Sequence, residues 1–267
     1  MSDISRLHNH FLKPRWEWRP RLNPNHPLSI GLVGLWLFNE TGGLKAYDLS
    51  GKHNDGTLIS GPTWKPGKFG QSLSFNGTSS YVNVPHSSSL NLPNKVTFAA
   101  WVYPTSFTDY DTVVAKDYGT GFWFGLYITT GTIQLWIGGA ANQSDGAVQL
   151  NKWSHIAATW DGTTINYYIN GVYDSSDTNS NAATTNTLNM YIGADRKSSA
   201  DPFYWFPGLI DGVRIYNRVL LASEIRWLYQ DPFAGIDVPI FKDYWPEVAA
   251  GGLSIPVAMR HYREMRN

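Results

Sequence analysis

Short apolar runs that alternate with turn residues are the feature that most restricts the fold of this chain. Such runs recur at the spacing typical of an antiparallel sandwich or barrel. Asp161-Gly162 and Asn170-Gly171 each separate two runs where a tight hairpin requires positive φ, which Asn and Gly adopt at low cost. The clearest runs cover residues 97–103, 122–128, 132–137, 153–160, 164–169, 188–192 and 209–216. The pattern predicts an all-β fold.

The composition agrees with a strand-rich chain. Only 5 of the 21 acidic residues are Glu, and Gly, Asn, Ser, Thr and aromatic residues are abundant, so good helix formers are scarce. One short helix is expected over residues 223–230, where Ile225, Leu228 and Tyr229 form a single apolar face.

The net charge and the missing cysteines exclude several classes of protein. With 21 bases and 21 acids the formal charge is zero, whereas proteins that bind nucleic acid or anionic lipid carry a basic excess. The absence of Cys removes disulfides, Cys-ligated zinc and thiol nucleophiles. No apolar stretch approaches the roughly 20 residues of a membrane span, and no signal-peptide core is visible. We therefore expect a protein without a transmembrane segment or signal peptide.

The charge is distributed unevenly along the chain. Residues 1–27 carry a net charge of +3 and residues 252–267 a net charge of +2, which leaves −5 for the middle. Both ends are rich in Pro and in large apolar residues. Pro restricts its own φ and the preceding residue, so a continuous helix or central strand is not expected there. The predicted organisation is an extended arm over 1–29, a β-domain over 30–231 and a second arm over 232–267.

The arms are too apolar for solvated linkers, so we expect them to dock on a partner surface. The partner is another protein of the same assembly or a second copy of the chain, which makes an oligomer or a lattice-bound state the expectation. The residues predicted to dock are Phe11, Trp16, Trp18, Arg19, Tyr244 and Trp245.

Several short motifs, taken in order, resemble the laminin-G-like branch of the concanavalin A-like jelly rolls. They are residues 31–40 (GLVGLWLFNE), 48–51 (DLSG), 54–57 (NDGT), 67–70 (GKFG), 73–77 (LSFNG), 81–85 (YVNVP), 98–102 (FAAWV), 153–157 (WSHIA), 160–162 (WDG), 168–172 (YINGV) and 208–218 (GLIDGVRIYNR). The resemblance implies two antiparallel sheets packed face to face, with about twelve to fourteen strands and with the first and last strands adjacent. Both arms would then leave from nearby points.

The resemblance leaves the function open, because this fold serves lectins, adhesion modules, carbohydrate-binding appendages and some glucanases. The arms and the single β-domain are similar to the versions found in tailed-phage particle proteins. One hypothesis is therefore a structural or adhesion protein on a virion surface, a capsid decoration or tail component that also binds glycans. The alternative is a free-standing or secreted lectin.

Catalysis is not expected. Glycoside hydrolysis requires two suitably spaced carboxyl groups, and the resemblance implies a Glu-x-Asp-x-Glu strand for glucanases of this fold, which the sequence lacks. His155 lies in a predicted strand without an evident acid partner, so serine chemistry is not indicated either.

A structural calcium near the first and last strands is implied by the resemblance, although no cofactor is required. The matching positions are Asp48, Asn54, Asn76 and Asp211. Asn76 stands where relatives usually carry Asp, and Gly212 where they usually carry an acid, so negative charge is lost at both positions. The alternative is that Asp48 and Asn54 cap turns while Asp211 pairs with Arg214 or a neighbour.

Aromatic residues in two strands predict a binding surface for sugars, whose C–H faces stack on rings. Strand alternation separates Trp123 and Tyr127 from the apolar residues of run 122–128, and Gln134 and Trp136 from those of run 132–137. If the aliphatic face forms the core, these four side chains share the opposite surface. Tyr204 and Trp205 are further candidates in a loop. The alternative is that an arm or loop covers this sheet. The four tryptophans at family core positions are assigned to packing: Trp36, Trp101, Trp153 and Trp160.

Overall fold

The computed structural model describes residues 20–237 except 109, 118, 128 and 196–202. These residues form a compact unit, Pro20–Asp237. It includes residues 20–29 and 232–237, which lie outside the predicted β-domain and contribute Leu28 and Ile236 to a buried cluster. The chain segments before residue 20 and after residue 237 are not described.

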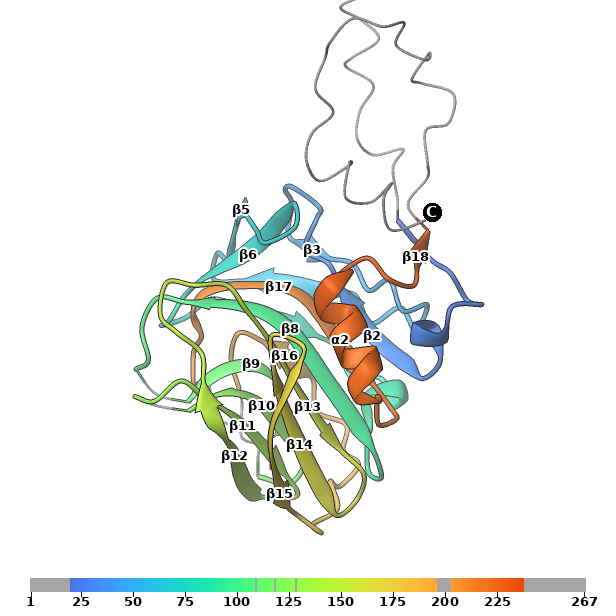
Figure 1. Cartoon of the computed structure of the whole chain (residues 1–267). Helices are drawn as coiled ribbons and strands as arrows, with labels where there is room; N and C mark the ends of the chain where they lie inside the picture. The colour runs from blue at the N-terminus through green and yellow to red at the C-terminus, as the bar shows by residue number, and fades with distance from the viewer. Residues whose placement is uncertain (1–19, 109, 118, 128, 196–202, 238–267) are drawn as a thin grey trace, which may run out of the picture. The chain divides into compact units, whose positions relative to one another are not determined.

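Two antiparallel sheets form the sandwich (Figure 1), which confirms the all-β prediction. Sheet I has the order β12-β11-β10-β9-β16-β7-β4-β3, and sheet II has the order β15-β14-β13-β8-β17-β6-β5, with β2 also paired to β17. The strands of sheet I are β3 (Lys45–Ala46), β4 (Gly56–Ile59), β7 (Tyr81–Val84), β9 (Asp111–Lys116), β10 (Phe122–Leu126), β11 (Thr132–Ile137), β12 (Ala140–Ala147) and β16 (Met190–Ile192). Those of sheet II are β2 (Leu32–Trp36), β5 (Thr63–Pro66), β6 (Gln71–Asn76), β8 (Val96–Pro104), β13 (Ser154–Trp160), β14 (Thr164–Ile169), β15 (Val172–Thr178) and β17 (Pro207–Tyr216).

Each predicted run contains a strand, although runs 122–128 and 188–192 extend beyond β10 and β16, and the predicted hairpin turns are present. Asn170 and Gly171 join β14 to β15 with φ of 52° and 74°, and Gly162 follows β13 with φ of 108°. The described residues contain more strands than expected because several, such as Lys45–Ala46, are only two residues long.

The core lies between the sheets and uses the faces that alternation predicts. Phe122, Phe124 and Leu126 of β10 are buried there, opposite residues of sheet II. The rings of Phe124 and Phe98 stack with centroids 5.5 Å apart. Burial of such side chains is the main stabilising contribution in a sandwich of this kind.

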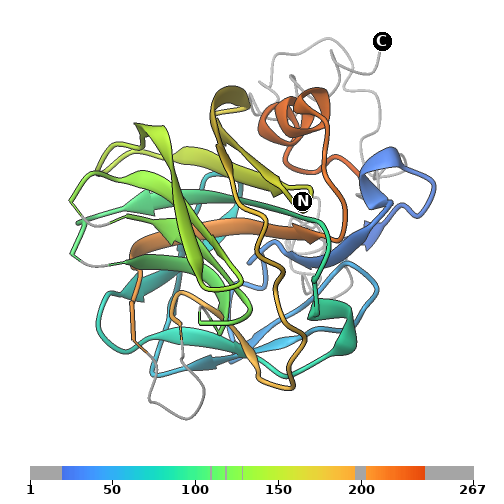
Figure 2. The same ribbon diagram turned by 90° about the horizontal axis from the view of Figure 1, so that it is seen from below.

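Among the described residues the α-helix is α2 (Ala222–Gln230), which covers the outer face of sheet II (Figure 1). The view from below also shows α2 (orange) outside the stacked strands (Figure 2). Its buried residues Ile225 and Leu228 belong to a second apolar cluster with Ala99, Ala157 and Tyr216 of the sheet. The helix begins one residue earlier than predicted, with Leu221 at the N-cap, and ends where predicted.

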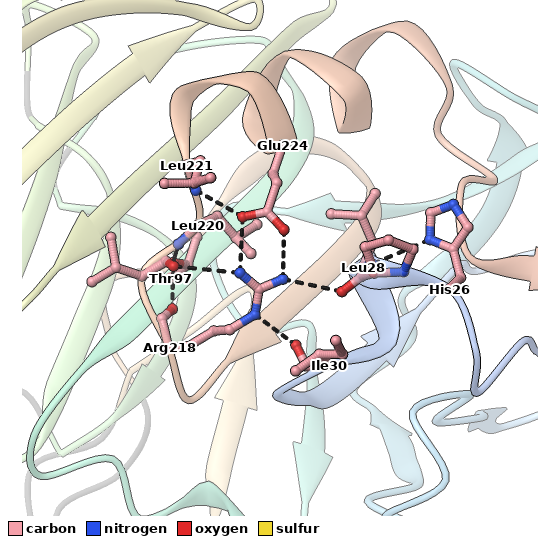
Figure 3. A network of polar contacts seen from close by, with 10 residues as sticks. His26, Leu28, Ile30, Thr97, Arg218, Leu220, Leu221 and Glu224 are labelled. Atoms are coloured by element: carbon pink, nitrogen blue, oxygen red, sulfur yellow. Dashed lines mark hydrogen bonds and ion pairs between the residues drawn. The ribbon is translucent and has the colours of Figure 1, made fainter.

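Leu221, the N-cap residue of α2, has no side-chain group that can accept a hydrogen bond. The hydrogen bonds at the start of the helix come from the Arg218–Glu224 ion pair instead (Figure 3). The Glu224 carboxylate accepts a hydrogen bond from the Leu221 N–H at 2.8 Å and two from the Arg218 guanidinium at 2.7 and 2.8 Å. Arg218 also donates to the carbonyl oxygens of Ile30 and Pro27, at 2.7 and 3.2 Å. The helix is thereby tied to the short 3-10 helix η2 (Pro27–Ser29).

The two ends of the compact unit lie side by side. Strand β1 (Arg21–Leu22) pairs antiparallel with β18 (Ile236–Asp237), and β2 pairs with β17. This confirms the expectation that the first and last strands are adjacent, and it brings residues 21 and 237 together. A further 3-10 helix, η3 (Ser88–Leu90), precedes β8.

Candidate functional site

The outer face of sheet I carries a continuous row of side chains across six strands. Directly paired residues of neighbouring strands point to the same side of a sheet. The pairing therefore places on one face Trp136, Trp123, Ala115, Tyr191, Asn83 and Thr57, in that order from β11 to β4. Three of these are aromatic, and Asn83 offers an amide beside them.

At one end of this row, aromatic side chains cluster around Tyr110, the residue immediately before β9. Its ring centroid lies 4.8 Å from that of Tyr204, 5.5 Å from Tyr127, 5.9 Å from Trp136 and 6.1 Å from Trp123. Tyr110, Trp123, Trp136 and Tyr204 line a shallow depression that has no space to enclose even one water molecule. A ligand here would therefore lie against the rings and not inside a pocket.

The segment 203–205 lies across the same face and adds a second aromatic group. The Thr112 N–H donates to the Tyr204 carbonyl at 3.2 Å, which fixes the segment on β9. Trp205 lies 5.8 Å from Tyr81, whose ring is 5.5 Å from Tyr191. The loop residues Tyr204 and Trp205 are thus brought to the face that the strands provide.

The prediction that Trp123 and Gln134 are exposed is wrong. Their side chains are only 1% and 5% exposed, because neighbouring aromatic residues cover them. Trp123 Nε1 donates to Thr112 Oγ1 at 2.7 Å, and Gln134 Oε1 accepts from Trp136 Nε1 at 2.8 Å. A covering loop, the alternative left open by the sequence, is what the structure shows over Trp123.

The other predicted surface residues are half-buried: Tyr127, Trp136, Tyr204 and Trp205. We call these four, together with Tyr110, the aromatic ledge. Trp123 and Gln134 support the ledge from below, and the role of all these residues in ligand binding stays a prediction.

Sequence analysis missed Tyr81, Asn83, Tyr110 and Tyr191. The first two could have been assigned to this face from the sequence, because alternation in 81–84 puts them on the side opposite the buried Val82 and Val84. Tyr110 could not be assigned to a face from the sequence, because it lies outside a strand, where alternation does not predict which way a side chain points.

The four predicted calcium ligands do not form one ligand set. Asp48 accepts four hydrogen bonds: from the N–H groups of Leu35 and Ser50 to Oδ1, and from Ser50 Oγ and the Asn54 N–H to Oδ2. All distances are 2.7–2.9 Å, so the lone pairs of the carboxylate are occupied. The Asn54 amide donates to the Val33 carbonyl at 2.8 Å.

Asn76 and Asp211 are engaged elsewhere. Asn76 Oδ1 accepts from the N–H groups of Thr78, Ser79 and Ser80 in its own turn. Asp211 Oδ2 accepts from the N–H groups of Lys68 and Phe69, and burial raises the pKa of Asp211 to about 7. Within the described ranges no three His, Asp or Glu side chains are grouped to hold a metal ion. The donor set does not fit calcium.

His155 has no catalytic setting. It lies on β13, is 3% exposed, and burial lowers its pKa to about 3, so the ring is neutral. The predicted docking residues Phe11, Trp16, Trp18, Arg19, Tyr244 and Trp245 lie outside the described residues. In the part of the chain that the structure describes, no helix has the length and hydropathy needed to cross a membrane.

Comparison with known proteins places these features in a family. The family model of the concanavalin A-like lectin/glucanases superfamily matches residues 76–226. The pentraxin-related protein PTX3 of Bos taurus is 27% identical over 146 residues, which is 49% of this chain and 38% of PTX3. This chain therefore spans well under half the length of that relative.

Two solved structures are similar in fold. Domain 4 of AbnA, an extracellular arabinanase from Geobacillus stearothermophilus, was solved in complex with arabinotriose. It is 26% identical with a TM-score of 0.61, and the match covers 74% of this chain and 98% of that domain. The binding domain of Paraclostridial Mosquitocidal Protein 1 has the same TM-score at 20% identity and covers 77% of this chain and 53% of that one. With more than half of its residues matched by the family model, this chain belongs to the concanavalin A-like lectin/glucanases superfamily.

Proposed function

We propose that this chain is a non-catalytic glycan-binding module whose aromatic ledge holds the sugar. The observation that supports this most directly is the set of half-buried rings around Tyr110, and the half-buried Asn83 offers an amide beside Tyr191 farther along the same face. Sugar C–H faces stack on such rings, and hydroxyl groups need polar partners beside them. The similar AbnA domain was solved with arabinotriose, which makes short arabinan the first ligand to try.

The proposal is tested by isothermal titration with arabinotriose and by a glycan screen. Trp136→Ala removes a half-buried ring of the ledge, and we expect at least a tenfold loss of affinity, or about 1.4 kcal/mol. Trp227→Ala is the matched control, because Trp227 is 40% exposed on α2, which covers the other sheet. It should leave affinity unchanged.

Two outcomes count against the ledge as the binding site. One is that the wild-type protein binds neither arabinan nor any common cell-surface glycan. The other is equal loss of affinity in Trp136→Ala and Trp227→Ala, which would place the sugar elsewhere. Circular dichroism of both variants ensures that the comparison is between folded proteins.

A second proposal concerns where the module is displayed. The pairing of β1 with β18 favours two arms that leave the unit together. Residues 1–27 and 252–267 carry net charges of +3 and +2, whereas the segment between them carries −5. We propose that they anchor the module on a virion surface, as a phage capsid decoration or tail component, through neighbouring virion proteins or further copies of the chain.

Deletion of residues 1–19 and 238–267 tests the anchoring proposal. We expect the truncated chain to be monomeric by light scattering and unable to join the particle, while it still binds sugar. Assembly that survives the deletion would contradict the proposal and leave glycan binding unaffected.

A further inference from the structure

A β-bulge in β17 turns two charged residues to the same side of sheet II. Asp211 pairs with Trp101, and Arg214 pairs with Ala99, with a register shift between them. Without the shift, residues three positions apart in a strand would face opposite sides. Gly212 stands in the bulge at φ +57°, a conformation that Gly adopts without the penalty of a side chain. Both charged side chains therefore face outward beneath α2.

These residues line a cavity between sheet II and the segment after α2. About 320 Å³ of space there is not filled by atoms, part of it open to solvent, and the enclosed part has room for one water molecule or one small ion at most. Leu37, Leu228 and Phe233 supply apolar walls. Asp211, Arg214, Trp101 and His155 supply the main polar ones.

The cavity concentrates hydrogen-bond groups that have no protein partner. Arg214 is 4% exposed, and the hydrogen bond of its guanidinium within the described part of the chain is to the Pro232 carbonyl at 2.5 Å. Trp101 Nε1 and His155 Nδ1 are buried without a partner among the described residues. An unmatched buried donor costs free energy, and an unmatched buried charge costs more. The walls therefore favour an occupant that accepts hydrogen bonds.

The charges that surround the cavity favour a negative occupant. The ion pair found in the described residues is Arg218–Glu224, so no described carboxylate lies within 4.0 Å of Arg214. The Asp211 carboxylate directs Oδ2 to the amides of Lys68 and Phe69. The Lys68 amine lies 5.1 Å from the centre of the Trp101 ring and adds positive charge at the rim.

We propose that this cavity binds one small monovalent anion, of halide size, between the Arg214 guanidinium and the Trp101 indole N–H. The site lies on the sheet opposite the aromatic ledge and is independent of glycan binding. A bound anion would place a counter-charge next to Arg214, on which Asp211 and Asp231 act only from more than 4.0 Å away, and would supply an acceptor for the indole.

The anion should bind more tightly at low pH. The pKa of Asp211 is raised to about 7 by burial, so this carboxyl is neutral at pH 5.5 and negative at pH 8. The other titratable groups that face the cavity are Arg214, Lys68, Asp231 and His155, and burial lowers the pKa of His155 to about 3, so its ring is neutral at both pH values.

Bromide is the probe for the test. Thermal unfolding of the full chain is followed while sodium bromide replaces sodium gluconate at constant ionic strength, at pH 5.5 and pH 8. We expect a saturating rise in Tm with a bromide dissociation constant at least threefold lower at pH 5.5. In crystals grown with bromide, an anomalous peak should lie between Arg214 and Trp101.

Two variants remove the proposed donors separately, and a third is the control. Trp101→Phe deletes the indole N–H and keeps an aromatic ring, and Arg214→Met deletes the charge. Each should weaken bromide at least tenfold. Trp205 lies far from the cavity, in the segment that crosses sheet I, so the Tm of Trp205→Phe should respond to bromide as the Tm of wild type does. This control separates binding in the cavity from a general effect of the salt.

If wild type and both cavity variants respond equally to bromide, or if no anomalous peak lies in the cavity, the proposal is overturned and water fills the space. Because Trp101→Phe changes few atoms, it keeps the test decisive even if Arg214→Met fails to fold.

Discussion

Asp211 shows how far a single residue's role depends on its surroundings. Its sequence context suggested a calcium ligand or a partner of Arg214, and in the structure its carboxylate holds the turn at Lys68 and Phe69. Strict alternation would have placed Asp211 and Arg214 on opposite faces. The bulge at Gly212 overrides it, and a glycine in a strand indicates such a bulge without giving its register.

The raised pKa of Asp211 makes stability depend on pH. Because the pKa is about 7 in the folded state and 3.8 in the reference state, its contribution to stability is full below pH 3.8 and is lost as the pH rises through 7. From pH 5 to pH 8 the loss is roughly 2–3 kcal/mol, or about 5–10 °C in Tm.

Asp211→Asn should remove this loss, since its amide oxygen can accept the same two N–H groups without a charge. Thermal melts of both proteins between pH 5 and pH 8 measure the effect. A variant that loses Tm as steeply as wild type would show that other groups cause the pH dependence.

Asp48 leads to a prediction about metal removal. Its four hydrogen bonds leave no lone pair for a cation, so we expect EDTA to change Tm by less than about 1 °C. Melts with EDTA and with added calcium check this. A clear fall in EDTA that calcium reverses would establish a calcium site and contradict the structural argument.

At the scale of elements, the strands were predictable and their coverings were not. The apolar face of 132–137 is buried as alternation requires, and the turn at Asn170-Gly171 has the expected positive φ. Trp123 is buried because Tyr110 packs over it and Tyr204, which is distant in sequence, packs on Tyr110. Contacts of this kind depend on loop conformation, which periodicity does not encode. Four of the five ledge residues were therefore predicted, whereas Tyr110 and the burial of Trp123 were not.

The link between α2 and η2 gives a prediction at the element scale. Arg218 donates to Glu224, Ile30 and Pro27, and hydrogen bonding to Glu224 raises the pKa of the guanidinium (Figure 3). Arg218→Ala removes these bonds, and we expect a loss of about 2 kcal/mol and a fall in Tm of about 4–8 °C.

Arg226→Ala is the matched control, since Arg226 is an exposed arginine on the same helix. Thermal unfolding should separate the two variants. Equal melting temperatures would mean that packing of Ile225 and Leu228 alone holds the helix on the sheet.

At the scale of the whole molecule, the ends of the compact unit pack on the sandwich and form a two-stranded sheet of their own. Strands β1 and β18 pair with each other, and Leu28 and Ile236 are 1% and 5% exposed in the cluster beneath α2. Leu22 and Phe233 pack against the same cluster. Proline-rich composition indicated extended chain at both ends, but it could not show which part of each end is buried.

Two truncations test where the folding unit ends. A chain of residues 20–237 keeps both strands and should melt within about 2 °C of the full chain. A chain of residues 30–231 loses Leu28 and Ile236, and because removal of a buried aliphatic side chain costs about 2–5 kcal/mol, its Tm should fall by more than about 10 °C. Equal stability of the two would mean that the β1–β18 pair contributes nothing to the fold. A folded 20–237 chain that retains sugar binding would also separate the module's recognition from whatever the arms contact.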